Sequence, residues 1–232
     1  MRPHRAHVPS LAPEVELLGR EAHHLVEVLR ARPGDALSVF DGKGREGRAR
    51  VLAVGRGWVR LRVEETWAAG REPPIPIVLY VPLLKGDHLA EVVRAATELG
   101  ATQVVPVLTR RCVVRELSEG KLLRLRRVAQ EAAKQCLRSV VPQVEPLCPL
   151  DQVPPVEQGF VAHPYAVGRV REVFDPTRPT ALITGPEGGL TEEEVGFLRA
   201  RGFIPVALGP RILRAETAPV ALLSLITAAE GL

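Results

Sequence analysis

Two glycine-containing loops near the C-terminus hold the residues whose types and spacing best suit chemistry. The first, Gly185–Gly189 (GPEGG), stands between the apolar run TALIT and an acidic helix start. Its glycines allow the main chain to come close to a bound molecule. Thr191 and Glu194 form a capping-box pattern, so the position where a phosphate would meet a helix N-terminus is already occupied. The loop predicts a site for a neutral or cationic ligand held by main-chain groups; the alternative is a tight strand-to-helix turn.

The second loop runs from Leu208 to Thr217 (LGPRILRAET), again between an apolar run and an apolar helix. It gathers Arg211, Arg214 and Glu216 between two hydrophobic elements. A third, shorter loop (AHPYA, 162–166) also follows an apolar run. Ligands of parallel α/β sheets bind beyond the carboxyl ends of the strands. We therefore expect these three loops to surround one ligand.

Other motifs point away from phosphate-loop, dinucleotide and metal chemistry. Gly42, Gly44 and Gly47 match G-x-G-x-x-G, but a second strand pattern follows them, which predicts a glycine-rich hairpin loop. The sequence contains no G-x-x-x-x-G-K-[ST]. Its three cysteines show no C-x-x-C spacing and its histidines no H-E-x-x-H pattern, so we expect neither a disulfide framework nor a metal site.

The elements that must position these loops alternate between strand and helix from residue 77 onward. Such alternation predicts an α/β domain with a mainly parallel sheet and helices on both faces. The expected strands span 77–84, 103–108, 159–163, 180–184 and 204–208, and the clearest helices span 87–99 and about 118–138.

The N-terminal part has a different rhythm. Residues 1–70 read as a small β domain with one helix near 21–30, because short alternating runs are broken by glycine turns. A stiff, proline-rich segment, 71–76, is the expected linker. The remaining residues, 77–232, form the expected α/β domain.

Charge is unevenly distributed along the 232 residues, whose net charge is +4. Residues 108–140 contain six more basic than acidic residues, an excess typical of a nucleic-acid-binding surface; the alternative is a solvated helix face. A hydrophobic content of 46% supports a packed core. No apolar stretch approaches the ~20 residues of a membrane span, and the first residues lack a signal-peptide core. We expect a cytoplasmic protein.

Several of these segments together resemble a known family. LITGPEGGLTEEEV and LGPRILRAETA resemble the signature of RsmE-type ribosomal RNA methyltransferases of the SPOUT superfamily. KGDHLAEVVRAATELGATQVVPVLTRRCVV and RVAQEAAKQC resemble the middle region of that family, and VLRARPGDALSVFDG resembles its N-terminal domain. The resemblance implies a trefoil-knotted SPOUT α/β domain preceded by a small PUA-like, RNA-binding β-barrel domain.

The resemblance also implies an activity. The protein would be a homodimeric enzyme that uses S-adenosylmethionine to methylate N3 of a uridine in 16S ribosomal RNA, with the assembled small subunit as its substrate. The implied cofactor-binding residues are His163, Pro164, Thr184, Gly185, Pro186, Glu187, Gly188, Gly189, Leu208, Gly209, Ile212, Leu213 and Thr217.

Two residues of the second loop are the candidates for catalysis. Arg214 could stabilise the anion that develops on uracil, since it cannot act as a base at neutral pH; the alternative is an interdomain or dimer salt bridge. Glu216 could act as the base or orient Arg214; the alternative is a carboxylate at a helix start that interacts with the helix dipole. The candidates for RNA contact are His4, Arg5, Arg124, Arg127, Lys134, Arg138 and Arg211.

Two other classes of function compete with this interpretation. A non-catalytic RNA-binding module acting on ribosomal RNA would explain the basic segment and the β domain, but it gives the paired Gly-Pro loops no purpose. A phosphate-handling nucleotide enzyme is disfavoured by the missing P-loop and the acidic helix start.

Overall fold

The structure, a computed structural model, describes residues 4–230 and divides into two compact units. Unit 1 contains the described residues up to Glu72 together with Ala133–Val141. Unit 2 contains Pro73–Ala132 and the described residues from Pro142 onward. The chain first passes between the units inside the segment that the sequence marks as a linker. The sequence did not predict the return of 133–141 to unit 1.

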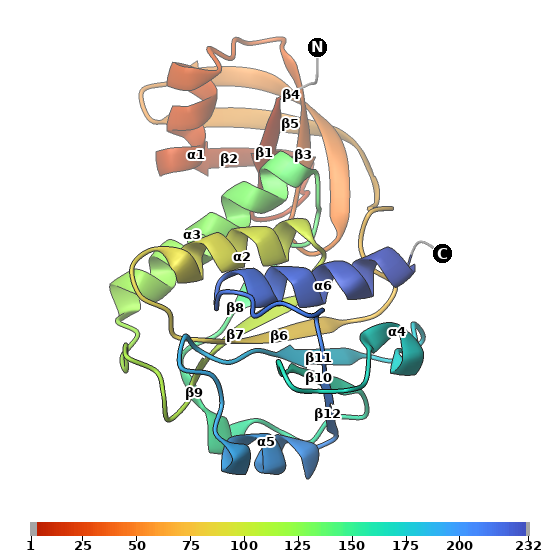
Figure 1. Ribbon diagram of the computed structural model, residues 1–232. Coiled ribbons are helices and arrows are strands. Elements are labelled where there is room, and N and C mark those ends of the chain that lie inside the picture. Colours follow the sequence, from red (N-terminus) through yellow and green to blue (C-terminus); the bar gives the residue numbers. More distant parts are fainter. Residues whose placement is uncertain (1–3, 231–232) are drawn as a thin grey trace. The chain divides into compact units, whose positions relative to one another are not determined.

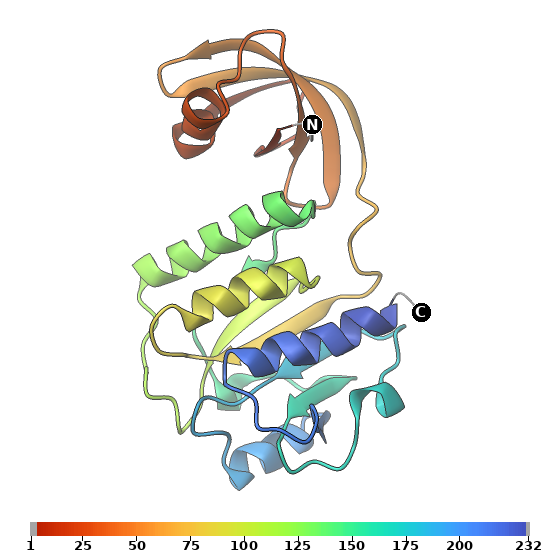
Figure 2. The same ribbon diagram turned by 45° about the horizontal axis from the view of Figure 1, so that its top comes forward.

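Unit 1 is built on a curled sheet of five strands in the order β1-β3-β4-β5-β2 (Figures 1 and 2). The strands are β1 (Arg5–His7), β2 (Glu14–Leu18), β3 (Ala36–Phe40), β4 (Arg45–Gly55) and β5 (Trp58–Ala68). Only β1 and β3 pair in parallel; the other pairs are antiparallel. A short helix, α1 (Gly19–His23), continues into one π-helical turn, His24–Val28, in the region where the sequence predicts a helix.

Alternation along the strands explains the core of unit 1. In β2, Val15 and Leu17 are buried while the residues between and beside them are exposed. This is the period of two expected for a strand with one covered face. The inward side chains pack with Leu25 of the helical segment and with Leu61 of β5.

The glycine-rich stretch around residue 42 is a hairpin loop, as predicted. It joins the antiparallel strands β3 and β4. Gly42 and Gly44 have φ angles of +72° and +100°, which glycine adopts without strain. Gly47 lies within β4, so the three glycines form no helix-capping phosphate loop.

Unit 2 contains a seven-stranded sheet in which every pair is parallel. Its order is β12-β10-β11-β6-β7-β8, with β9 also pairing with β7. The strands are β6 (Ile77–Pro82), β7 (Gln103–Leu108), β8 (Gln143–Val144), β9 (Cys148–Pro149), β10 (Gly159–Ala162), β11 (Thr180–Ile183) and β12 (Phe203–Val206). The predicted mainly parallel sheet is therefore confirmed.

Helices cover both faces of this sheet. They are α2 (His88–Glu98), α3 (Glu119–Cys136), α4 (Val170–Val173), α5 (Glu192–Arg199) and α6 (Thr217–Glu230), with a 3₁₀ turn at Leu150–Gln152. Helices α2 and α6 lie side by side over one face, and α5 lies on the other (Figures 1 and 2). Every residue of β11 is buried, as expected of a parallel strand covered on both sides.

The sequence located the long elements of unit 2 to within a few residues and missed β8, β9 and α4, which are too short to show a period. The trefoil knot stays a prediction. None of the helices within residues 4–230 combines the length and apolar character that a membrane crossing requires.

Candidate functional site

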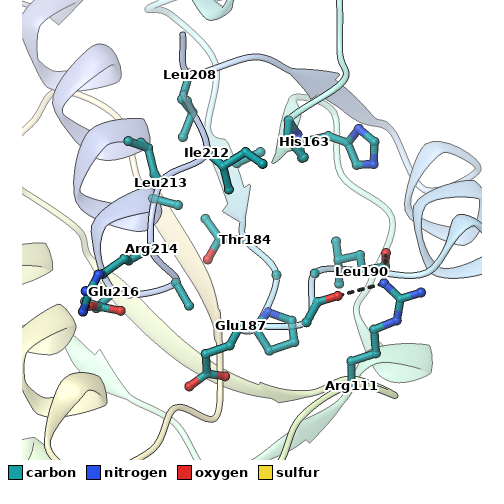
Figure 3. A pocket seen from close by; sticks show the side chains of 18 of the residues that line it. Arg111, His163, Thr184, Glu187, Leu190, Leu208, Ile212, Leu213, Arg214 and Glu216 are labelled. Atoms are coloured by element: carbon teal, nitrogen blue, oxygen red, sulfur yellow. Dashed lines mark hydrogen bonds and ion pairs between the residues drawn. The ribbon is translucent and has the colours of Figure 1, made fainter. Parts of the chain in front are cut away.

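Four parallel strands of unit 2 end at the same edge of the sheet, and the segments after them line one cavity. Strands β6, β11, β10 and β12 are neighbours in that order, so their carboxyl ends lie together. The cavity has a volume of about 810 Å³. The structure thus brings the three loops of the sequence prediction around one space (Figure 3).

Most of the predicted site residues line this cavity. They are His163, Pro164, Thr184, Gly185, Pro186, Glu187, Gly188, Gly189, Leu208, Gly209, Arg211, Ile212, Leu213, Arg214 and Glu216. Thr217 is the exception among the cofactor candidates, since it is absent from the lining. It is the first residue of α6, and its amide donates to the carbonyl of Arg214 at 3.0 Å, so it serves the helix start.

The glycine loop after β11 folds back on itself. The amide of Gly189 donates to the carbonyl of Pro186 at 2.8 Å, and Gly189 has a φ angle of +71°. A Cβ atom on Gly185 would lie 3.0 Å from the amide nitrogen of Leu190, so a side chain there would force the loop to shift. Glycine is required at these two positions for the loop to keep this shape.

The predicted capping box ends the loop and starts α5. The Thr191 hydroxyl accepts from the Glu194 amide at 3.2 Å, and the Glu194 carboxylate accepts from the Thr191 amide at 2.8 Å. Glu194 is buried and also accepts from the Arg110 amide at 2.7 Å. The helix N-terminus is thus closed by its own side chains, and no anion needs to bind there.

Thr184 places a polar atom in the cavity that the protein does not satisfy. The residue is 0% exposed, and its hydroxyl oxygen makes no hydrogen bond within residues 4–230. Its side chain lies in the middle of the lining residues (Figure 3). Because a buried hydroxyl without a partner costs free energy, this position favours a ligand that supplies one.

The loop after β12 offers main-chain groups in the same way. No hydrogen bond joins the backbone of residues 208–213 to the rest of the described chain, whereas Arg214, the next residue, anchors α6 through its carbonyl. Gly209 has a φ angle of +125°. Ile212 is 78% exposed and Leu213 is half-buried, so the loop also presents apolar surface. Free amides and carbonyls beside apolar side chains suit a flat heterocyclic ligand.

Arg214 and Glu216 stand next to each other at one side of the cavity (Figure 3). The Nη1 atom of Arg214 lies 3.9 Å from the Glu216 carboxylate, which is a long ion pair. The Arg214 side chain is 84% exposed and that of Glu216 is 22% exposed. A weak, solvated pair of this kind leaves the guanidinium free to bind a substrate oxygen.

Sequence reasoning missed five polar or aromatic residues of the lining: Lys85, His88, Arg111, Tyr165 and Glu192. Lys85 and His88 follow β6 directly, and Arg111 follows β7. The rule that ligands bind beyond the carboxyl ends of parallel strands could have found these three if it had been applied to every strand. Tyr165 belongs to the short loop after β10 but was not singled out.

Three of the residues predicted to bind RNA are instead buried in ion pairs of unit 1. Lys134 Nζ lies 3.1 Å from the Glu21 carboxylate, and Arg138 lies 2.7 Å from that of Glu72; their side chains are under a tenth exposed. The buried Arg5 guanidinium donates to two carbonyls of the 133–141 segment and to a hydroxyl there. The structure argues against RNA contact by these three, because their charges hold unit 1 together rather than facing solvent.

The other RNA candidates keep accessible side chains. Arg127 and Arg211 are exposed, and His4 is half-buried. Arg124 is also exposed and donates to Asp87 at 2.6 Å. This hydrogen bond lowers the pKa of Asp87 and raises that of Arg124.

Comparison with known proteins gives consistent matches over the length of the chain. Residues 71–227 match the family model of an RNA methyltransferase domain, and residues 17–64 match that of an RNA methyltransferase PUA domain. Two curated relatives are named ribosomal RNA small subunit methyltransferase E. The one from Synechocystis sp. is 37% identical over 92% of this chain and 73% of its own length. The one from Bacillus subtilis is 33% identical over 93% and 90%.

A solved structure extends the likeness to three dimensions. It is a ribosomal RNA small subunit methyltransferase E from Neisseria gonorrhoeae bound to S-adenosyl methionine. It superposes with a TM-score of 0.90 at 30% identity and covers 99% of this chain and 98% of its own.

Proposed function

This chain belongs to the family of RNA methyltransferases that carry a PUA domain, and from that premise we propose its reaction. It transfers a methyl group from S-adenosylmethionine to N3 of a uridine in small-subunit (16S) ribosomal RNA. The relatives named above supply the substrate class. Because bacteria such as Bacillus subtilis make their ribosomal subunits in the cytoplasm, we propose that the reaction takes place there.

One observation carries the cofactor assignment: the cavity gathers unsatisfied polar groups that match this cofactor. The Thr184 hydroxyl and the main chain of residues 208–213 lack partners in the described chain. An adenosine presents hydrogen-bonding edges and a flat face to such groups. The volume of about 810 Å³ fits a small-molecule site. When bound, S-adenosylmethionine supplies a methyl group on a cationic sulfur.

Charge in the cavity agrees with this ligand. Glu187, in the glycine loop, lines the cavity, and its carboxylate would favour a ligand that carries a positive charge. The N-terminus of α5 is closed by its capping box, so the strongest anion-binding position of the site is occupied. A ligand that combines a positive centre with a neutral heterocycle is therefore favoured over a nucleotide polyphosphate.

We assign to Arg214 the stabilisation of the methyl acceptor, the uracil ring. Methyl transfer to uracil N3 requires loss of the N3 proton, and negative charge then spreads over the two neighbouring carbonyl oxygens. An exposed guanidinium with two parallel N–H donors can stabilise that charge. Glu216, next to it, orients the guanidinium or accepts the proton. Alignment of the uracil N3 with the methyl group lowers the activation barrier further, by up to ~7–11 kcal/mol.

The RNA would be held mainly through its phosphates. Arg127 and Arg211 are exposed, as is Lys85 at the cavity, and each can neutralise a phosphate. Tyr165 and Val167 are 81% and 96% exposed. Such exposed apolar surface supports assembly as a homodimer, in which a second copy of the chain would cover it. The substrate we favour is a large ribonucleoprotein, the assembled small subunit.

The test is a methylation assay with mapping of the product. The purified protein is incubated with labelled S-adenosylmethionine and small subunits that lack the modification, then with the same RNA free of protein. We expect one labelled N3-methyluridine per subunit, located as a stop in reverse transcription because N3 methylation blocks base pairing. Subunits that are already modified serve as the control. Binding of the RNA without any label transfer would instead identify a non-catalytic RNA-binding module.

A further inference from the structure

The turn that follows β7 is fixed by a compact network of its own. The amide and the hydroxyl of Thr109 contact the Cys112 sulfur at 3.5 and 3.2 Å, and the Cys112 amide donates to the Thr109 carbonyl at 3.3 Å. Both residues are buried. The two residues between them, Arg110 and Arg111, are therefore displayed from a rigid position.

Arg111 reaches from this turn to the glycine loop. Its Nη1 atom donates to the carbonyl of Gly188 at 2.8 Å and lies 3.5 Å from the carbonyl of Leu190 (Figure 3). Its side-chain stem lies against Gly188, where a Cβ would come within 3.1 Å of the Arg111 Cβ. No carboxylate pairs with Arg111 among the ion pairs of the described chain. Its charge is thus directed at two loop carbonyls.

A second tie joins the same two segments. The buried carboxylate of Glu194 accepts from the main-chain amide of Arg110 and from that of Thr191, at the far end of the loop. Within residues 4–230 the Arg110 side chain, by contrast, makes a single exposed ion pair, with Glu193 at 3.3 Å. The two neighbouring arginines therefore differ sharply: one side chain braces the loop and the other lies on the surface.

We propose that Arg111 is a positioning residue that holds the glycine loop, residues 185–189, and the adjoining Leu190 in the shape that binds S-adenosylmethionine. The inference rests on the proposed function. By fixing the carbonyls of Gly188 and Leu190, Arg111 orders the loop before the cofactor arrives and so lowers the entropy that binding must remove. A charged donor to a carbonyl makes a stronger bond than a neutral one.

The shape of the guanidinium matters as well as its charge. One nitrogen, Nη1, contacts both carbonyls, and its two N–H groups are held in the plane of the rigid guanidinium, whereas a lysine ammonium rotates at the end of a flexible chain. Lysine at this position would keep the charge of the cavity but lose the two-carbonyl geometry. The R111K substitution therefore separates positioning from simple electrostatic attraction to the cofactor.

The experiment uses the full chain in three variants, Arg111→Ala, Arg111→Lys and Arg110→Ala, the last as the matched control. S-adenosylmethionine affinity is measured by calorimetry. Loop order is measured without cofactor, as hydrogen exchange of the Gly189 amide, which donates to Pro186 within the loop. We expect both Arg111 variants to weaken binding about tenfold and to speed this exchange by a similar factor, with Arg110→Ala close to wild type.

The other outcomes decide against the inference. Arg111→Lys with wild-type affinity would show that charge alone suffices. Weaker binding with unchanged exchange would make Arg111 a direct cofactor contact, and faster exchange with unchanged affinity would show that the order is irrelevant to binding. Failure of the wild-type protein to bind S-adenosylmethionine would overturn the proposed function, and this inference with it.

Discussion

Replacing Thr184 with valine should stabilise the protein and weaken cofactor binding at the same time. Valine has nearly the shape of threonine but lacks the hydroxyl, which is buried and unpartnered in residues 4–230. Leaving such a hydroxyl unsatisfied costs about 1–3 kcal/mol. The lower end of this range applies because the Thr184 hydroxyl adjoins the cavity. Thr184→Val should therefore raise the free energy of unfolding by about 1 kcal/mol. In a chain of this size that raises the Tm by about 2–4 °C.

Binding should change in the opposite direction. A hydrogen bond from the Thr184 hydroxyl to S-adenosylmethionine contributes about 1 kcal/mol, so its loss should weaken binding roughly fivefold. Thermal unfolding without ligand and calorimetric titration with S-adenosylmethionine measure the two effects separately.

Thr180 provides the matched control, since it is the first residue of β11, the strand that Thr184 directly follows, and it is also buried. Its hydroxyl accepts from Gln158 at 2.7 Å and donates to the carbonyl of Arg178 at 3.0 Å. Thr180→Val removes both of these buried hydrogen bonds and should lower stability by about 1–3 kcal/mol. The reasoning about Thr184 is refuted if Thr184→Val lowers the Tm as Thr180→Val does, or if it binds S-adenosylmethionine as tightly as wild type.

Three further predictions concern the reaction, the loop and pH. Arg214→Ala should bind the cofactor normally but lose about 10²–10³-fold in methyl transfer, measured as single-turnover label incorporation, because only the developing anion needs the guanidinium; full activity would remove Arg214 from the mechanism. Thr191→Ala removes a helix cap and should cost about 1 kcal/mol, seen as a fall of about 2–4 °C in Tm; an unchanged Tm would show that the cap is dispensable. Burial lowers the pKa of His7 below its usual value of 6.5, although the nearby Glu21 opposes this. The unfolded chain therefore takes up a proton first, and stability is lost as pH falls below about 6.5. In urea titrations His7→Gln should remove part of this loss, and an unchanged pH dependence would contradict it.

The sequence alone determined the local features of this protein. Residues 181–183 form a buried parallel strand because they are continuously apolar, and the glycine loop follows because only glycine fits where the chain turns back on Leu190. The capping box of Thr191 and Glu194 lies within four residues and so could be read directly. Recurrence of strand, loop and helix then fixed the parallel sheet, and with it the edge where the loops meet.

Only the tertiary structure decided which long side chains face what. Lys134 and Arg138 share a helical rhythm with exposed arginines, yet they are buried because carboxylates more than 60 residues away, on Glu21 and Glu72, compensate their charge. Lys85 lines the cavity because it follows β6, and β6 ends beside β11 only once the sheet has formed. Charge patterns along a helix are local, whereas the partner that buries or frees a charge is set by contacts distant in sequence.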